Sequence, residues 1–381
     1  MRFKIKGTRL AVLLAPALAM AMPALANTAS SVLSDATEPG SVIVFPKFIN
    51  GEAYILPESV PAPATELEIG VVCPKGVTCS EHQSVKIRFH WVCGTSEANL
   101  AGSFICQETD FDVTATVFEK IVLVADGTFQ NGYGTGLPTK TVPAAPCANG
   151  YLIGWVITPT SDTPIKFDGL IGDAVVRTSG TAQAGYNAIP IQADPNLASG
   201  AAITTNANGA LLFDGGAGHY QALTGQVLGD VRYTGTASGV SAQGYLTLLT
   251  LDVKSNRPNN PVFVDLDFFG GNPSAIGNEN QLSTSTEFIC WEEVPITSIN
   301  RDLTTALMGR KGVFVSAPAT KVQIFGITDE SGPTTLLGLA ETQEGGGEPG
   351  WAPRVSFSNL FNSSVPVATR FLPTPSPIFL P

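Results

Sequence analysis

Residues 85–91, Val-Lys-Ile-Arg-Phe-His-Trp, alternate strictly between apolar and polar side chains. Successive side chains of a β-strand point to opposite faces of a sheet, so this period of two predicts a strand with one face in a core and one in water. Similar strands are predicted at residues 67–71, 111–117 and 245–253. Helical periodicity is scarce, and one short helix is predicted at residues 303–308. Short strands without long helices between them favour an all-β sandwich or barrel architecture.

Turn-forming clusters separate the predicted strands. Gly and Asn accept the backbone conformations that tight turns need. Turns are therefore predicted at Asp126-Gly127, Asn131-Gly132, Asn208-Gly209 and Asn259-Asn260-Pro261. The Gly-rich residues 344–350 predict a further loop. Residues 372–377 predict an extended tail, because each Pro lacks the N–H group that an interior strand donates.

Several landmarks recur in the same order along the chain. Val85, Ile87, Phe89 and Trp91 match Val262, Val264, Leu266 and Phe268 in phase, and Leu67, Ile69 and Val71 match Leu249, Leu251 and Val253. Residues 104–108 recur as residues 288–292, and Ile157, Pro164 and Leu170 recur as Ile327, Pro333 and Leu339. Two interpretations stay open, an internal duplication and coincidence among apolar strands. A duplication predicts two tandem, immunoglobulin-like β-sandwich domains, residues 27–200 and 201–381, with residues 198–209 as a linker or exposed loop.

The N-terminus has the layout of a secretory signal peptide. Four basic residues precede an apolar stretch that contains two prolines, and Ala24-Leu25-Ala26 is a small-x-small cleavage site. We therefore expect residues 1–26 to be removed, which leaves 17 basic residues against 32 acidic ones. A net charge of −15 disfavours binding to nucleic acid or to anionic lipid. No later apolar run is long enough for a transmembrane helix.

Six cysteines in an exported chain predict three disulfides. They are Cys73, Cys79, Cys93, Cys106, Cys147 and Cys290. Cys73 and Cys79 bracket a turn-like segment and are predicted to pair locally. Cys93 with Cys106 is the next predicted pair, which leaves Cys147 with Cys290. A zinc site is the alternative, but the sequence lacks the two clustered CxxC pairs that zinc sites favour.

The three histidines offer little evidence for a catalytic or metal site. His90 lies on the polar side of its predicted strand, so we expect a solvated residue rather than a ligand. His82 has no second His at metal-binding spacing. His219 ends the Gly-rich segment 214–220, which suits a tight loop near a site but fits no nucleotide-binding fingerprint.

Carboxylates and a serine give weaker candidates. Asp265 and Asp267 share one face of a predicted strand, and Asp168 and Asp173 flank a glycine turn. A solvated face or a self-capped turn is the more ordinary interpretation, with calcium ligands as the alternative. Ser241 misses the spacing of a nucleophile elbow by one residue. The sequence thus predicts no catalytic, cofactor-binding or metal residue.

Three segments resemble a group of secreted bacterial β-rich proteins to which no activity is assigned. They are residues 40–46, Gly-Ser-Val-Ile-Val-Phe-Pro, residues 150–156, Gly-Tyr-Leu-Ile-Gly-Trp-Val, and residues 168–174, Asp-Gly-Leu-Ile-Gly-Asp-Ala. The resemblance covers about the first half of the mature chain. It implies export and a β-rich fold, and it implies no functional residue.

These observations predict a non-enzymatic secreted or cell-envelope protein with a structural, adhesive or assembly role. It would act through strand edges and surface loops, and its partner would be a second copy or another surface protein. Residues 365–372 could add a strand to a neighbour, although a core strand in their own domain is the favoured interpretation. The alternative is an extracellular protein that binds or hydrolyses a glycan, with a calcium requirement as an option. Sugar-stacking surfaces would then come from Trp155, Trp291 and Trp351.

Overall fold

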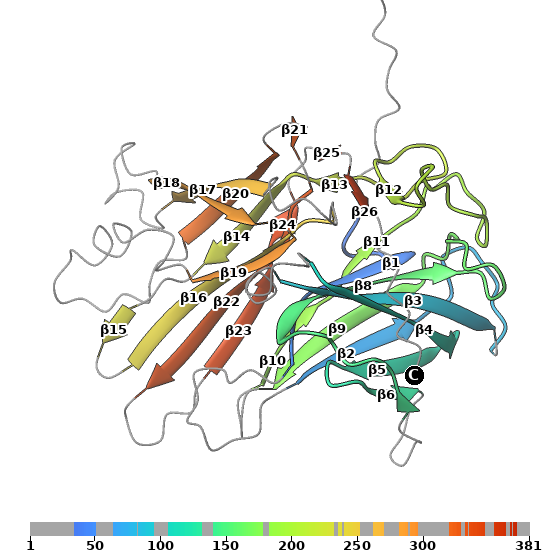
Figure 1. Cartoon of the computed structure of the whole chain (residues 1–381), viewed down its shortest axis with the longest axis horizontal. Helices are drawn as coiled ribbons and strands as arrows, with labels where there is room; N and C mark the ends of the chain where they lie inside the picture. The colour runs from blue at the N-terminus through green and yellow to red at the C-terminus, as the bar shows by residue number, and fades with distance from the viewer. Residues whose placement is uncertain are drawn as a thin grey trace, which may run out of the picture. The chain divides into compact units, whose positions relative to one another are not determined.

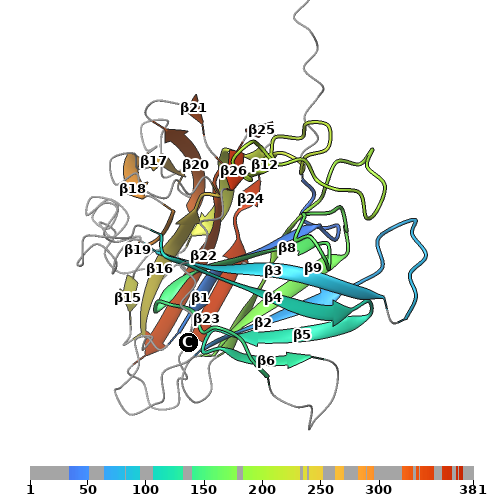
Figure 2. The same ribbon diagram turned by 45° about the vertical axis from the view of Figure 1, so that its right-hand side comes forward.

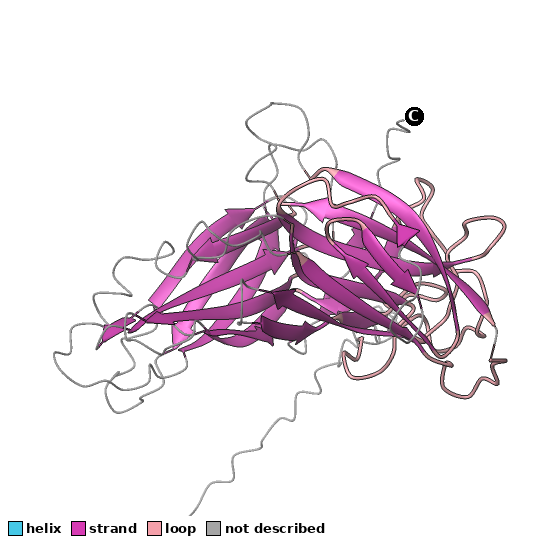
Figure 3. Ribbon diagram, turned by 90° about the horizontal axis from the view of Figure 1, so that it is seen from below, coloured by secondary structure: helices cyan, strands magenta, loops and turns pink. Residues whose placement is uncertain are grey.

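Antiparallel strands make up the fold. The computed structural model describes residues 34–50, 64–81, 83–94, 106–131, 140–177, 183–231, 235–237, 240–251, 262–269, 282–288, 290–295, 320–328, 332–333, 335–346, 354–362, 366–367 and 369–371. Every regular element in these ranges is a strand (Figure 3). Every ladder between two of these strands is antiparallel. The all-β class predicted from the alternating segments is therefore confirmed.

Strands β1 to β11 form two sheets, which we call the N-terminal half. A five-stranded sheet has the order β11-β1-β8-β3-β4, with β1 (Val42–Ile49), β3 (Ser84–Cys93), β4 (Glu108–Thr116), β8 (Asn149–Ile157) and β11 (Ile189–Ile191). A six-stranded sheet has the order β10-β9-β2-β5-β6-β7, with β2 (Thr65–Val71), β5 (Glu119–Val124), β6 (Thr128–Asn131), β7 (Lys140–Thr141), β9 (Leu170–Arg177) and β10 (Gln183–Asn187). Figure 2 shows these two sheets as neighbouring layers.

Strands β14 to β24 form two further sheets, the C-terminal half. One has the order β18-β17-β20-β14-β24 with β21 on β20, and contains β14 (Gln226–Val231), β17 (Val262–Phe269), β18 (Leu282–Phe288), β20 (Thr320–Thr328), β21 (Gly332–Pro333) and β24 (Phe361–Asn362). The other has the order β15-β16-β22-β23 with β19 on β16, and contains β15 (Gly235–Ala237), β16 (Val240–Leu249), β19 (Trp291–Pro295), β22 (Leu337–Gly346) and β23 (Arg354–Asn359).

Two short ladders join the segment between the halves to the last described strands (Figure 1). They pair β12 (Leu211–Phe213) with β26 (Thr369–Phe371) and β13 (Leu223–Thr224) with β25 (Pro366–Val367). Phe371 is fully buried. The described part of residues 365–372 therefore pairs within its own chain, as the favoured interpretation expects.

The two halves follow the same scheme of strand pairing. In the N-terminal half the ladders are β11-β1, β1-β8, β8-β3, β3-β4, β10-β9, β9-β2 and β2-β5. In the C-terminal half the ladders in the same chain order are β24-β14, β14-β20, β20-β17, β17-β18, β23-β22, β22-β16 and β16-β19. Even a short bridge recurs, since Ile157 pairs with Pro164 and Ile327 pairs with Pro333.

The recurring landmarks of the sequence agree with this scheme only in part. The alternating segments that start at Val85 and Val262 fall on β3 and β17, which hold the same place in it. Val71 lies opposite Leu170, the first residue of β9, and Leu249 lies opposite Leu337, the first residue of β22. Val71 therefore corresponds to Leu249 rather than to Val253. The match of residues 104–108 with 288–292 is wrong, since Cys106 precedes β4 whereas Cys290 follows β18.

Strands β1 and β8 of the five-stranded sheet in the N-terminal half are buried on both faces of that sheet. The first face of the sheet packs on the six-stranded sheet in a core that includes Phe45, Phe89 and Leu67. Its second face packs in another core that includes Val44, Phe213 and Trp291. Strands buried on both faces are apolar almost without interruption, which explains why β1 and β8 lack the alternation seen in β2.

All six cysteines form disulfides, and one of the three predicted pairs is confirmed. Cys73–Cys79 closes the predicted turn, where Gly76 takes a φ of 77°. The predicted pairs Cys93–Cys106 and Cys147–Cys290 are wrong, because the bonds are Cys93–Cys147 and Cys106–Cys290. Cys93 lies opposite Gly150 in the β3-β8 ladder, which brings it close to Cys147. The bond from Cys106 to Cys290 links the N-terminal half to the C-terminal half.

Several predicted boundaries shift in the structure. Residues 198–209 form a mostly exposed loop, which is one of the two predicted alternatives, and Ile203 anchors it because this residue is buried and its N–H donates to the Pro164 carbonyl. The strand predicted at 245–253 runs from Val240 to Leu249, and residues 344–346 of the predicted Gly-rich loop belong to β22. The turns at Gly127 and Gly209 are present, with φ values of 92° and 82°. Residues 259–261, 303–308 and 372–377 lie outside the described residues.

Candidate functional site

A β-bulge in β1 turns Lys47 towards the C-terminal half. Phe45 lies opposite Leu152 and Phe48 opposite Gly150, so β1 has one more residue than β8 in this stretch. Such a bulge bends the strand and changes the direction of a side chain. Pro46 suits a bulge because it has no N–H group to give to a ladder.

Side chains from two other strands hold the bulge in place. The indole Nε1 of Trp291, on β19, donates to the Pro46 carbonyl at 2.8 Å. The Lys47 N–H donates to the Tyr186 hydroxyl at 3.2 Å, and the same hydroxyl donates to the Lys47 carbonyl. Buried backbone groups need such partners. The bulge therefore satisfies its backbone through side chains of both halves.

The Lys47 ammonium lies between two carboxylates, and we call Lys47, Glu293 and Glu341 the Lys47 site. The distance from Lys47 Nζ to Oε2 is 2.5 Å for Glu293 and for Glu341. The side chains of Lys47 and Glu341 are 1% and 0% exposed, and that of Glu293 is 25% exposed. One cation and two anions thus meet in the interior with a single partly exposed member.

Aromatic side chains surround the Lys47 site. Lys47 Nζ lies 6.0 Å from the centre of the Phe357 ring, and Tyr245 and Phe357 lie opposite Glu341 on the neighbouring strands. Burial, followed by the charges of Glu293 and Glu341, raises the pKa of Tyr245 to about 12. Two half-buried aromatic rings thus border a site that is fully buried at Lys47 and Glu341. No sequence motif marks this site, although a Lys in an otherwise apolar strand was a signal that could have found it.

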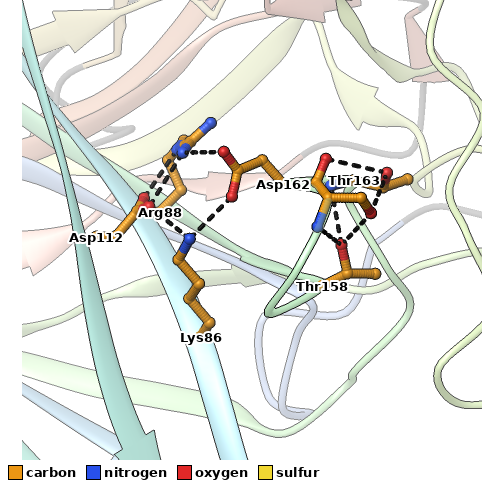
Figure 4. A network of polar contacts seen from close by, with 7 residues as sticks. Lys86, Arg88, Asp112, Thr158, Asp162 and Thr163 are labelled. Carbon is orange, nitrogen blue, oxygen red and sulfur yellow. Dashed lines mark hydrogen bonds and ion pairs between the residues drawn. The ribbon is translucent and has the colours of Figure 1, made fainter.

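A second polar cluster joins β3 and β4 to the loop that contains Asp162 (Figure 4), and its charged side chains are 22–49% exposed. Arg88 lies opposite Asp112, with Nε to Oδ1 at 2.8 Å, and Lys86 Nζ reaches Asp112 Oδ2 at 2.9 Å. Asp162 contacts both cations, with Oδ1 2.8 Å from Lys86 Nζ and Oδ2 3.1 Å from Arg88 Nη2. The loop around Thr158 and Asp162 is held by its own side-chain hydrogen bonds. This network balances two positive and two negative charges, which leaves little net attraction for a charged ligand.

The charges of this network favour its ionised forms. Burial acts to raise the pKa of Asp112, but hydrogen bonds and charges from Arg88 and Lys86 outweigh it, and the pKa is lowered. The pKa of Asp162 is lowered by its hydrogen bond to Lys86 and then by Arg88. Mutual stabilisation of this kind is typical of a structural surface network.

His90 is buried, so the prediction of a solvated residue is wrong. Its side chain is 2% exposed, stacks on Trp155 with ring centres 4.8 Å apart, and meets Phe371 edge-on. Its Nδ1 lies 3.3 Å from Glu108 Oε2, which is also buried. The second core covers this end of β3, whereas Lys86 and Arg88 further along the same face stay near solvent. The pair thus lies in the interior, with the two side chains 2% and 1% exposed.

His219, the other described histidine, is bonded within its loop. His219 Nδ1 lies 2.7 Å from Asp214 Oδ1, which also accepts from the Gly216 N–H. The Gly218 N–H donates to Asp194 at 2.8 Å. The Gly-rich segment is thus a tight, internally bonded loop, as predicted. His82 lies outside the described residues.

Among the candidate acids, the side chains of Asp168 and Asp173 have different structural surroundings. Asp168 accepts from the Ser41 hydroxyl at 2.6 Å and from the Ala193 N–H at 2.9 Å, so it fastens two distant segments. Asp173 lies in β9, where burial and then the charge of Glu68 raise its pKa. Asp265 and Asp267 lie in β17. Among the described residues, no group of three or more His, Cys, Asp or Glu side chains is placed to hold a metal ion.

The serine and tryptophan candidates lie in ordinary structural positions. Ser241 lies within β16, paired with Gly345, and not at a strand-to-helix turn. Trp155 and Trp291 are 3% and 2% exposed, so neither offers a surface for sugar stacking. Trp351 lies outside the described residues.

Comparison with known proteins adds no relative. No protein-family model, curated protein or solved structure matches the chain. The resemblance to secreted bacterial β-rich proteins stays a prediction. The described part of the chain contains no helix of the length and apolarity that crossing a membrane requires.

Proposed function

We propose that this chain is an exported, non-enzymatic structural or assembly protein of the cell envelope or cell exterior. The single observation that carries the proposal is the Cys106–Cys290 disulfide, which joins the two halves covalently across 184 positions. Three disulfides suit an oxidising compartment outside the cytoplasm, and the predicted signal peptide agrees with that location.

The proposal extends to the domain arrangement. We infer two tandem sandwich units that arose by internal duplication, with the boundary near residue 200. The repeated order of seven ladders supports this inference. The connectivity differs from the immunoglobulin order ABED and CFG, because β1 pairs with β8 and β11 while β2 lies in the other sheet.

Such a protein would act by contact, through its strand edges and surface loops. The covalent link between the halves restricts how their surfaces move relative to each other. A protein with such preorganised surfaces loses less conformational entropy when it assembles. The glycan-binding alternative is weakened, because two of the three tryptophans that it relied on, Trp155 and Trp291, are buried. Self-association or binding to another surface protein is therefore the interaction that we propose.

Electron microscopy and light scattering of the purified mature protein over a concentration series test the proposal. We expect filaments, sheets or defined oligomers. A Cys106→Ala/Cys290→Ala variant should lose assembly, whereas Cys73→Ala/Cys79→Ala should keep it, because that disulfide closes a local loop within one half. A monodisperse monomer that cleaves a polysaccharide would overturn the proposal.

A further inference from the structure

The Lys47 site places an amine against a carboxyl group under conditions that favour their condensation. Lys47 and Glu341 lie 294 positions apart, in different halves, with Nζ 2.5 Å from Oε2. Both side chains are almost fully withdrawn from solvent, and Glu293 approaches the same nitrogen at 2.5 Å from a partly exposed position. Bringing two reacting groups together in a fixed geometry replaces a bimolecular encounter, with effective concentrations of up to roughly 10⁵–10⁸ M.

We propose that Lys47 Nζ and the side-chain carboxyl carbon of Glu341 form an intramolecular amide, with Glu293 as the proton carrier. The proposal goes beyond the structural role above and would hold equally if this chain had another function. It makes the Lys47 site a site of spontaneous covalent modification that joins the two halves.

The reaction balances without any further reagent. A proton passes from the Lys47 ammonium to the Glu341 carboxylate, which leaves a neutral amine and a neutral acid. The amine nitrogen attacks the carboxyl carbon and the C–N bond forms. Glu293 accepts the proton that nitrogen loses and delivers it to the departing hydroxyl group. The C–O bond breaks, one water leaves, and Glu293 ends in its starting state.

Burial explains why the equilibrium favours the amide. An ion pair withdrawn from water bears a desolvation cost on each charge. The amide carries no charge, so that cost disappears. The released water can leave past Glu293, which is the one member with contact to solvent.

Exposure also decides between the two carboxylates. Glu341 is 0% exposed, so amide formation there removes the more deeply buried negative charge, whereas Glu293 is 25% exposed and keeps its contact with solvent. General acid–base transfer requires a group within hydrogen-bond reach of the reacting atoms, and Glu293 meets that condition at 2.5 Å. We therefore assign Glu341 as the acyl group and Glu293 as the positioned acid and base.

Mass spectrometry of the full mature protein, denatured and with its disulfides reduced, tests the amide. The expected mass is that of the mature sequence minus one water, and endoproteinase Lys-C should fail to cut after Lys47. The fragment that contains Lys47 should then be joined to the fragment that contains Glu341. The chain offers an internal control, because Lys75 lies 3.8 Å from Glu38 but is 89% exposed and should be cut normally.

Variants separate the amide from a plain ion pair. Glu293→Gln should restore the full sequence mass, and Glu341→Leu should do the same, whereas Glu38→Gln should leave the loss of one water in place. A full-mass wild-type protein with normal cleavage at Lys47 overturns the proposal. A Glu293→Gln protein that still lacks one water overturns the role of Glu293.

A stability measurement gives an independent readout. Lys47→Met/Glu341→Leu removes both charges and fills their space with apolar groups. Replacing a buried ion pair in this way is often neutral or stabilising, so an unchanged or higher denaturation midpoint would count against the amide. A lower midpoint is expected if the pair is a covalent link across 294 positions.

Discussion

Removal of the Cys106–Cys290 disulfide should destabilise the protein far more than removal of the Cys73–Cys79 disulfide. A cross-link stabilises chiefly by lowering the entropy of the unfolded chain, and the effect grows with the logarithm of the loop length. The two bonds close loops of 184 and 6 positions. The loop-entropy relation gives about 5 kcal/mol for the long loop and about 2 kcal/mol for the short one.

The comparison uses two double variants, Cys106→Ala/Cys290→Ala and Cys73→Ala/Cys79→Ala, unfolded by guanidinium chloride without reductant. Both variants lose one disulfide, so the difference of about 3 kcal/mol between their free energies of unfolding isolates the effect of loop length. The slope of each transition shows whether the unfolded state has expanded as expected. Equal losses of stability, or a larger loss for Cys73→Ala/Cys79→Ala, would refute the reasoning.

Three further substitutions test local features. Gly94→Ala places a methyl group 2.5 Å from the Trp291 ring, so we expect a loss of about 1–3 kcal/mol in chemical denaturation, and an unchanged midpoint would contradict the packing. Phe118 is 57% exposed at a φ of 70°, so Phe118→Gly should raise thermal stability by about 1 kcal/mol through relief of left-handed strain, and destabilisation would contradict that account. The folded pKa of Asp112 is lowered, so its contribution is present above its unfolded pKa of about 3.9 and is lost as the pH falls through the folded value. Asp112→Asn should therefore lower the free energy of unfolding by up to about 1 kcal/mol near pH 7. The difference in stability between the variant and the wild type should become smaller as the pH is lowered. A difference that grows on acidification would contradict the lowered pKa of Asp112.

Local alternation predicted the strands well wherever one face of a sheet meets a core and the other meets water. Strand β2 shows this pattern in its burial, and so does β3 as far as Phe89. The pattern misled at His90 because the second core covers that end of the sheet. Phe371 contacts His90 from 281 positions away in the sequence, and no short window of sequence contains that contact.

The disulfide partners illustrate the same limit. Proximity in sequence correctly paired Cys73 with Cys79, where a turn of a few residues closes the loop. It failed for Cys93 and Cys147, which the β3-β8 ladder brings together across 54 positions. Ladder order is a property of the whole sheet, so the pairing could be predicted only once the strand order was known.

The contact between Lys47 and Glu341, which joins the halves, could not be predicted from the sequence for a related reason. Lys47 is one charged residue in an apolar strand, and its bulge turns it towards Glu341 of the other half. Removal of Lys47 would leave a buried negative charge on Glu341 without that partner, and breaking a buried pair in this way costs several kcal/mol. Each residue on its own violates the rule that charges stay at the surface. The two buried charges compensate each other when the halves are joined. This ion pair therefore favours the joined arrangement of the two halves.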